Sequence, residues 1–251
     1  MDANMIFSQV LAWFADPAHW RGPDGVGVRI AEHLYYTVVA VLIASAIAAP
    51  VGLLVGHTAR GGVVLVGSAN AMRALPTLGL LTFLFLLLRS QAAATLVALV
   101  VLAVPPVLAG SYAGVRSVEA GVVDAARGMG MTSAQRLWQV ELPGAVALLL
   151  GGVRSAVLQV VATTTVAAYV GLGGLGRLLL DGLNSADYPQ MAAGALIIAG
   201  LAVLLDLLLA GVARLVVPTG CQLSRQSEGG RLSRQPDWGR LAATQLGRIG
   251  G

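Results

Sequence analysis

Long apolar stretches without charge recur along this chain, and they restrict its fold more than any other feature. Residues 34–56 form a run of 23 residues in which none is charged. As a helix this run would rise about 35 Å, enough to cross a hydrocarbon core of roughly 30 Å with some tilt. Hydrophobic residues make up 57% of the 251 residues and charged residues only 11%, outside the range of soluble domains. The sequence therefore predicts a protein embedded in a lipid bilayer.

Further apolar stretches predict an all-α, polytopic membrane helical bundle of about five transmembrane helices. Proline interrupts two of them. Pro76 predicts one helix with a kink, and Pro105 and Pro106 free backbone carbonyls that neighbouring helices must satisfy, which places their helix inside a bundle. The spans are expected at residues 34–56, 62–88, 92–113, 146–170 and 191–216, with a glycine-rich connection at 171–190.

The distribution of arginine predicts the orientation of the spans. All 16 basic residues are Arg, and most lie in the links at 56–62 and 116–143 and after residue 214. The positive-inside rule places these links in the cytoplasm and the N-terminus outside, as an odd number of spans also requires. The net charge of +4 thus reflects topology and not nucleic-acid binding, because no basic run adjoins a stacking aromatic. We expect an extracytoplasmic segment at 1–33, a membrane domain at 34–216 with a charged loop at 116–143, and a disordered cytoplasmic tail at 217–251.

The charged loop carries the most specific pattern in the chain. Its residue types predict two short helices with a joint: glycines weaken helix continuity, Thr132 and Gln135 form a capping box, and Pro143 closes the segment. Two adjacent alanines leave a surface that another protein can approach. The pattern reads Asp124-Ala125-Ala126-Arg127-Gly128-Met129-Gly130, then nine residues, then Val140-Glu141-Leu142-Pro143.

This pattern resembles the signature of binding-protein-dependent ABC importer permeases: Glu-Ala-Ala, three residues, Gly, nine residues, Ile, one residue, Leu-Pro. The spacing matches at every position, with Asp124 in place of Glu and Val140 in place of Ile. In that family the loop is the coupling helix, which seats in a groove of a separate ATPase and transmits its ATP-driven closure to the spans. The resemblance implies an ATPase-coupling role for Asp124, Ala125, Ala126, Gly128, Gly130, Leu142 and Pro143.

Shorter patterns look like permeases for glycine betaine, carnitine, choline or proline. They lie at 128–132 (GMGMT), 140–143 (VELP), 152–154 (GVR) and 171–176 (GLGGLG). The resemblance implies a multi-pass protein of the bacterial inner membrane that works by alternating access. Its partners would be ABC ATPase subunits, an extracytoplasmic solute-binding protein and a second permease subunit, either identical or a sibling. Permeases for methionine, other amino acids or oxyanions carry similar glycine loops and stay as alternatives.

Polar residues within the spans are candidates for a translocation pathway or gate, although threonines in spans also commonly bond their own backbone. Charges there are costly and should face protein or water. We expect the intramembrane charge Asp206 to pair with Arg154 or Arg73. The candidate pathway residues are Gln159, Thr163, Thr164, Thr165, Tyr169, Gly171, Gly173 and Gly174.

No catalytic, nucleotide or metal site is predicted. The glycines at 171–176 fit GxGxxG but lack the preceding soluble strand, and a chain without Lys has no Walker A motif. ATP and Mg would therefore be bound by the partner ATPase, and no cofactor by this chain. His19, His33 and His57 lack the HExxH spacing of a metalloprotease, and Cys221 is the single cysteine. An intramembrane enzyme and a passive channel are the other function classes considered; a channel would transport regardless of ATP hydrolysis.

Overall fold

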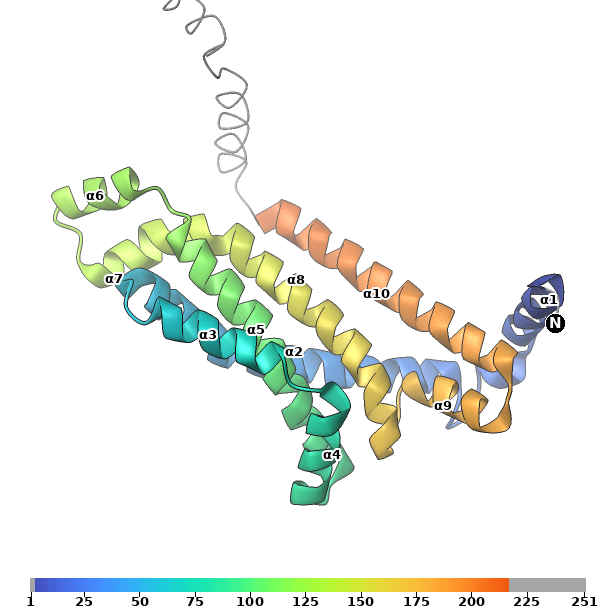
Figure 1. The fold of residues 1–251 in the computed structure, drawn as a ribbon. Coiled ribbons are helices and arrows are strands. Elements are labelled where there is room, and N and C mark those ends of the chain that lie inside the picture. Colours follow the sequence, from blue (N-terminus) through green and yellow to red (C-terminus); the bar gives the residue numbers. More distant parts are fainter. Residues whose placement is uncertain (1–2, 217–251) are drawn as a thin grey trace, which may run out of the picture. The chain divides into compact units, whose positions relative to one another are not determined.

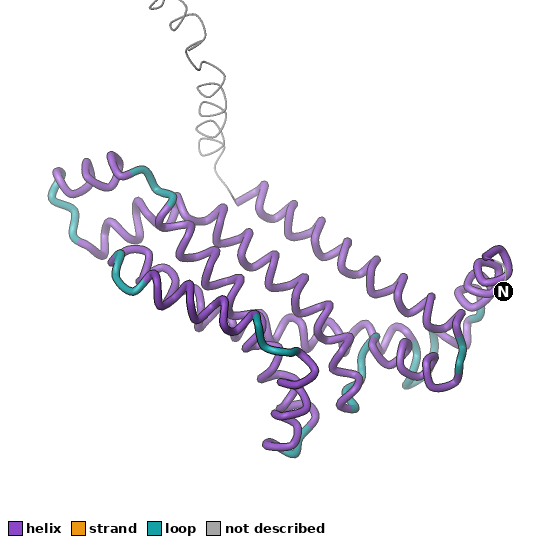
Figure 2. The backbone as a smooth tube through the Cα atoms, viewed as in Figure 1, coloured by secondary structure: helices purple, strands orange, loops and turns teal. Residues whose placement is uncertain are grey.

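The computed structural model describes residues 3–216, and every regular element in that part of the chain is a helix (Figures 1 and 2). The chain divides into two units, Met1–Arg214 and Leu215–Gly251. The description below concerns the first unit and the final helix, α10, whose last two residues, Leu215 and Val216, are assigned to the second unit. The tail predicted at 217–251 lies outside the described residues.

Three long helices form the centre of the first unit: α2 (Val26–Thr58), α5 (Gln91–Arg116) and α8 (Leu142–Ala167). Small residues let these helices approach closely, as helix association inside a membrane requires. A Cβ on Gly110 of α5 would lie 2.7 Å from the Cα of Gly152 in α8, and one on Gly52 of α2 would lie 2.8 Å from the carbonyl oxygen of Leu108. The core between them is built largely from Ala40, Val41, Ala44, Ala48, Leu99, Ala103, Val107, Ala156, Val160 and Val161.

Four of the predicted spans are confirmed with longer bounds, and α5 bears out the expectation that its prolines lie inside the bundle. Pro105 and Pro106 are both buried within an uninterrupted helix. The first span is α2, which already begins at Val26, and the fourth is α8 with a short 3-10 turn (Ala168–Val170) after it. The fifth span is also confirmed, as α10 (Tyr188–Val216).

The single kinked helix predicted at 62–88 is wrong. Two helices, α3 (Gly62–Arg73) and α4 (Thr77–Leu88), are separated by a bend of 86° at Pro76. Proline lacks the backbone N–H that would donate the next helical hydrogen bond, and it disfavours helical backbone at the residue before it. The helix that begins at Gly62 therefore ends before Pro76 and does not continue through it with a smaller kink. The described residues therefore contain four helices able to span a bilayer, or five if the bent pair counts as one.

Helices also occur where none was predicted. α1 (Ala3–Ala15) and a 3-10 turn (Pro17–His19) precede α2, and α9 (Gly176–Ser185) lies within the predicted connection at 171–190. Trp13 of α1 is buried beside Val26, Leu175 and Leu178. The N-terminal segment is therefore packed onto the end of the bundle where α2 begins.

The charged loop at 116–143 holds α6 (Ala120–Gly128) and α7 (Ser133–Arg136), so the prediction of two short helices with a joint is confirmed. The capping box is present, with Gln135 N donating to Thr132 Oγ1 and Thr132 N donating to Gln135 Oε1. Pro143 does not close the segment, because helix continues without a break over Ser133–Val170. A wider, π-helical turn at Leu137–Glu141 relieves the conflict between a proline ring and the preceding turn.

Candidate functional site

The first half of the charged loop, α6, has one buried side and one exposed apolar side. Ala126 is 2% exposed, whereas Val122 and Met129 are 49% and 76% exposed. Together with the exposed Ala125, these two residues occupy positions i, i+3 and i+7, which share one helix face. The sequence predicted that Ala125 and Ala126 both form the approachable surface. This is wrong for Ala126, whose side chain is buried against the rest of the chain. We call Val122, Ala125 and Met129 the α6 face.

The joint after α6 is a glycine-terminated helix end. Gly130 has φ +81°, and the backbone N–H groups of Met131 and Gly130 donate to the carbonyls of Ala126 and Arg127 at 3.2 and 2.9 Å. This is the Schellman pattern, which favours glycine because the conformation is left-handed. A Cβ on Gly128 or Gly130 would meet nothing within 4 Å. Both glycines therefore face open space.

The charged residue of the signature, Asp124, is on the surface. Its carboxylate pairs with Arg127 one turn later, Nη1 to Oδ1 at 3.2 Å, and both side chains are more than half exposed. At the far end of the signature, Leu142 is half-buried and Pro143 is exposed. The signature residues thus divide into surface positions and positions that face the bundle.

A polar cluster, buried at His57 and Glu141 and exposed at Ser133, joins the end of α2 to the start of the Ser133–Val170 helix. We call it the His57 clasp. His57 Nδ1 lies 2.5 Å from Glu141 Oε2, and His57 Nε2 lies 2.5 Å from Ser133 Oγ. The other oxygen of Glu141 faces Arg136 Nε at 3.6 Å. The side chains of His57 and Glu141 are 8% and 5% exposed. Sequence reasoning missed this cluster; a Glu beside an apolar span was the available signal, since buried carboxylates need partners.

A cavity of about 220 Å³ adjoins the clasp, and it is lined by His57 and Glu141 together with Asp124 and Arg127 of α6. The α6 helix and the end of α2 thus line the same cavity, which has charged side chains in its wall.

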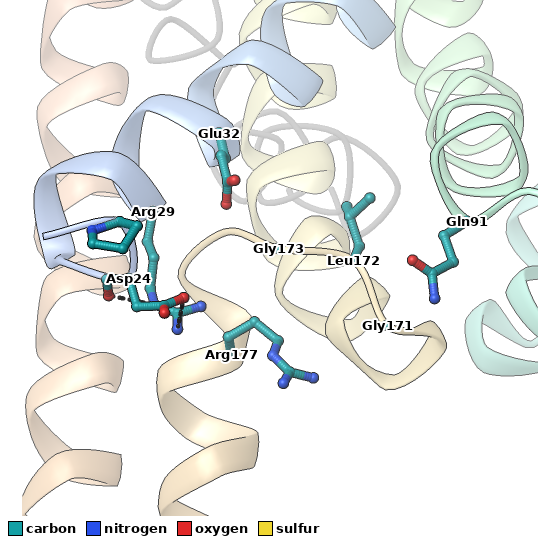
Figure 3. A pocket seen from close by; sticks show the side chains of 9 residues that line it. Asp24, Arg29, Glu32, Gln91, Gly171, Leu172, Gly173 and Arg177 are labelled. Atoms are coloured by element: carbon teal, nitrogen blue, oxygen red, sulfur yellow. Dashed lines mark hydrogen bonds and ion pairs between the residues drawn. The ribbon is translucent and has the colours of Figure 1, made fainter.

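The opposite end of the bundle, where α9 begins, holds a larger polar pocket of about 410 Å³ (Figure 3). Glu32 points from α2 to the glycine turn after α8, where its Oε2 accepts a hydrogen bond from Gly174 N at 2.7 Å. A Cβ on Gly173 would collide with the Glu32 carboxylate, and one on Gly171 with the Gln91 amide. At Gly171 and Gly173, side chains of the same chain therefore pack directly against the glycine backbone.

The candidate pathway residues do not converge within one chain. The three threonine hydroxyls donate to the carbonyls of Gln159, Val160 and Val161 in their own helix, at 2.8, 2.8 and 3.3 Å. Backbone bonding, the alternative considered for them, is thus what the structure shows. Gln159 and Tyr169 are exposed, while Gly171 and Gly173 line the pocket at the α9 end. Thr163 and Thr164 are buried.

The predicted intramembrane ion pair is confirmed, and it joins α8 to α10. Arg154 donates through Nε to Asp206 Oδ1 and through Nη2 to Oδ2, the second contact at 2.5 Å. Such a two-pronged pair satisfies both charges within the spans. Arg73 is not part of it: it is exposed at the end of α3.

Residues 29–219 match the family described as the binding-protein-dependent transport system inner membrane component. The chain belongs to this family. It is similar to the glycine betaine/carnitine/choline transport system permease protein OpuCB of Bacillus subtilis, with 31% identity over 194 residues, 77% of this chain and 89% of that protein. It is also similar to the osmoprotectant import permease protein OsmW of Salmonella typhimurium, with 33% identity over 194 residues, 75% of this chain and 90% of that protein.

Solved structures show the same fold. The inward-facing MetNI methionine ABC transporter has a chain that matches with a TM-score of 0.68 and 23% identity, covering 77% of this chain and 96% of that chain. The predicted fold class, an ABC importer permease bundle, is therefore confirmed. As a transport permease component, this family member carries the α6 face and the His57 clasp at one end of its bundle and the glycine pocket at the other.

Proposed function

We propose that this permease imports a small osmoprotectant, such as glycine betaine, carnitine, choline or proline, by ATP-driven alternating access in a bacterial inner membrane. The observation that carries the proposal is the α6 face, an exposed apolar stripe in which Ala125 and Met129 belong to the family's signature. The choice of solute is supported by the named solutes of its relatives, which share the quaternary ammonium group in glycine betaine, carnitine and choline.

The proposed partner at the α6 face is an ABC ATPase, which binds the ATP and Mg that drive transport. An exposed apolar stripe on a helix is suited to a groove in another protein. The loop at 116–143 would then face the cytoplasm and the N-terminus the outside, as the arginine distribution predicts. A solute-binding protein would dock on the outside, and a second permease subunit, identical or a sibling, would complete the pathway.

The long helix Ser133–Val170 supports a mechanical link between the ATPase and the spans. It runs without a break for 38 residues, about 57 Å at 1.5 Å per residue. Its first turn, α7, lies beside α6, and its last turns lie at the pocket near α9. A push on α6 would therefore tilt a rigid element that reaches the opposite end of the bundle, which is the movement that alternating access requires.

The decisive experiment is uptake by proteoliposomes that contain the permease, its ATPase and its binding protein. We expect ATP-dependent uptake of labelled glycine betaine or choline, and uptake about 30-fold lower in Ala125→Arg, because a bulky charge at the centre of an apolar interface removes about 2 kcal/mol or more of binding. Ala12→Arg, at an exposed alanine of α1, is the matched control and should transport normally.

Three outcomes would overturn parts of the proposal. Normal uptake by Ala125→Arg would refute the coupling role of the α6 face. Uptake of methionine in place of glycine betaine would assign a different solute to the same class of permease. Uptake that persists with a hydrolysis-deficient ATPase would indicate a passive channel.

A further inference from the structure

The His57 clasp ties together two elements that are far apart in sequence. His57 is in the last turn of α2, 84 residues before Glu141 and 76 before Ser133. All three side chains belong to the end of the bundle that carries α6. Because His57 and Glu141 are almost wholly buried, water cannot easily replace their hydrogen bonds. Separation of α2 from the long helix at this point would leave a buried carboxylate without its partner, which is costly.

The chemistry of the clasp favours a permanent connection. An ionised carboxylate only accepts hydrogen bonds, so this contact requires the His57 tautomer that carries a proton on Nδ1. A serine hydroxyl can either donate to Nε2 or accept from it by rotation. With this tautomer, one imidazole can make both contacts at once. Arg136, on the same helix as Glu141, forms an ion pair with the second carboxylate oxygen at 3.6 Å, which is longer than a hydrogen bond.

A second histidine fastens α2 to the same helix at the opposite end. His33 is fully buried, and its Nε2 lies 3.1 Å from the carbonyl oxygen of Val161. The two histidines are 24 residues apart, about 36 Å along a helix. His33, near the start of α2, contacts Val161 near the end of the Ser133–Val170 helix. His57, at the end of α2, contacts Glu141 near the start of that helix. The two helices are therefore antiparallel. They are connected at both ends of their shared length.

We propose that His57 is a positioning residue that carries movement of α6 and α7 into α2, so that α2 and the Ser133–Val170 helix move as one body during transport. The inference rests on the proposed coupling function. Without the clasp, the His33 contact and the shared core would still join the two helices, but the end of α2 nearest α6 would no longer follow a push on the loop. Part of the ATP-driven movement would then be lost within the bundle. The pathway would then open incompletely although the ATPase still closed.

The first test measures solute carried per ATP hydrolysed in the full reconstituted complex. His57→Phe keeps a flat ring and removes both hydrogen bonds, and we expect it to lower this ratio about fivefold or more, the lower range of coupling between linked sites. Glu141→Gln keeps an oxygen acceptor for Nδ1 and should preserve at least half of the ratio. Thr58→Val is the matched control, because the Thr58 hydroxyl donates only to Leu54 of its own helix; its ratio should equal that of the wild type.

The second test measures movement directly in a Cys221→Ser background. Spin labels at Thr58 and Trp138, both exposed, report the distance between α2 and the long helix. With His57 present this distance should be the same in the nucleotide-free and ATP-trapped complexes. In His57→Phe it should differ between the two states.

The outcomes separate this inference from the proposed function. If the wild-type complex shows no ATP-driven uptake, the proposed function fails. If the wild type transports and His57→Phe keeps its ratio, only the positioning role fails. A parallel loss of uptake and hydrolysis, with an unchanged ratio, would show that His57 serves folding alone and would also refute the proposal.

Discussion

The two glycine-rich segments of this permease look alike in sequence but differ in what surrounds them. At 128–130, glycine side-chain positions face open space, and Gly130 has a left-handed backbone that ends α6. At 171–176, the same positions are filled by Glu32, Gln91 and the carbonyl of Thr165. The glycines of the first segment adjoin free surface, whereas side chains and backbone of the same chain pack against Gly171, Gly173 and Gly176 of the second. A glycine pattern alone therefore does not distinguish an interface from an internal packing site.

The largest effect is expected from Gly176→Ala, at the filled segment. The new Cβ would collide with the backbone carbonyl of Thr165 and lie 2.9 Å from the Cβ of Ala168. Because a backbone atom cannot rotate away, the substitution should lower the free energy of unfolding by about 3 kcal/mol. Thermal unfolding of the purified permease in detergent would measure this loss.

Gly128→Ala is the matched control in the open segment. It adds the same methyl group inside a helix, where nothing lies within 4 Å, and alanine is the better helix former. Its midpoint of unfolding should equal or exceed that of the wild type. Equal losses in the two variants would show that the segments do not differ in packing.

A smaller effect is expected from Gly130→Val. This variant tests whether the open segment needs glycine for its left-handed backbone, since a side chain there would meet no neighbouring atom. Valine in the left-handed region costs roughly 1–2 kcal/mol, so the end of α6 should open more often. Faster hydrogen exchange at the amide of Met131, which donates to the carbonyl of Ala126 and is present in every variant, would report this opening. Gly130→Asn should stay close to the wild type, because asparagine tolerates this conformation; identical exchange in both variants would contradict the assignment.

Local patterns predicted most of the helices and the internal architecture of the loop. Long apolar runs must be kept from water, and Thr132 with Gln135 caps a helix end through local hydrogen bonds. Charges within a span, such as Arg154 and Asp206, need a partner of opposite sign. These needs do not depend on the rest of the fold, so the sequence predicted all three features. The position of the break at Pro76 was also visible. Its size of 86° was not, because the angle between two helices depends on what they pack against.

The functional details that sequence did not reveal depend on tertiary contacts. Ala125 and Ala126 are identical in type, and only the packing of α6 makes one exposed and the other buried. His57 and Glu141 are 84 residues apart, so no local spacing relates them. Gly173 looks like a flexible position until Glu32 occupies the space beside it.

The smallest effect is expected from Asp124→Asn. This variant tests whether a negative charge next to the open segment contributes to binding of the partner. The pair with Arg127 is exposed and one turn apart, so its loss should change stability by less than about 0.5 kcal/mol. If the carboxylate also meets the ATPase, solute uptake should fall about twofold while stability is retained. Arg127→Gln breaks the same pair and leaves the carboxylate, so it should transport normally. Equal uptake in the two variants would show that Asp124 serves only its neighbour, and that the α6 face alone binds the partner.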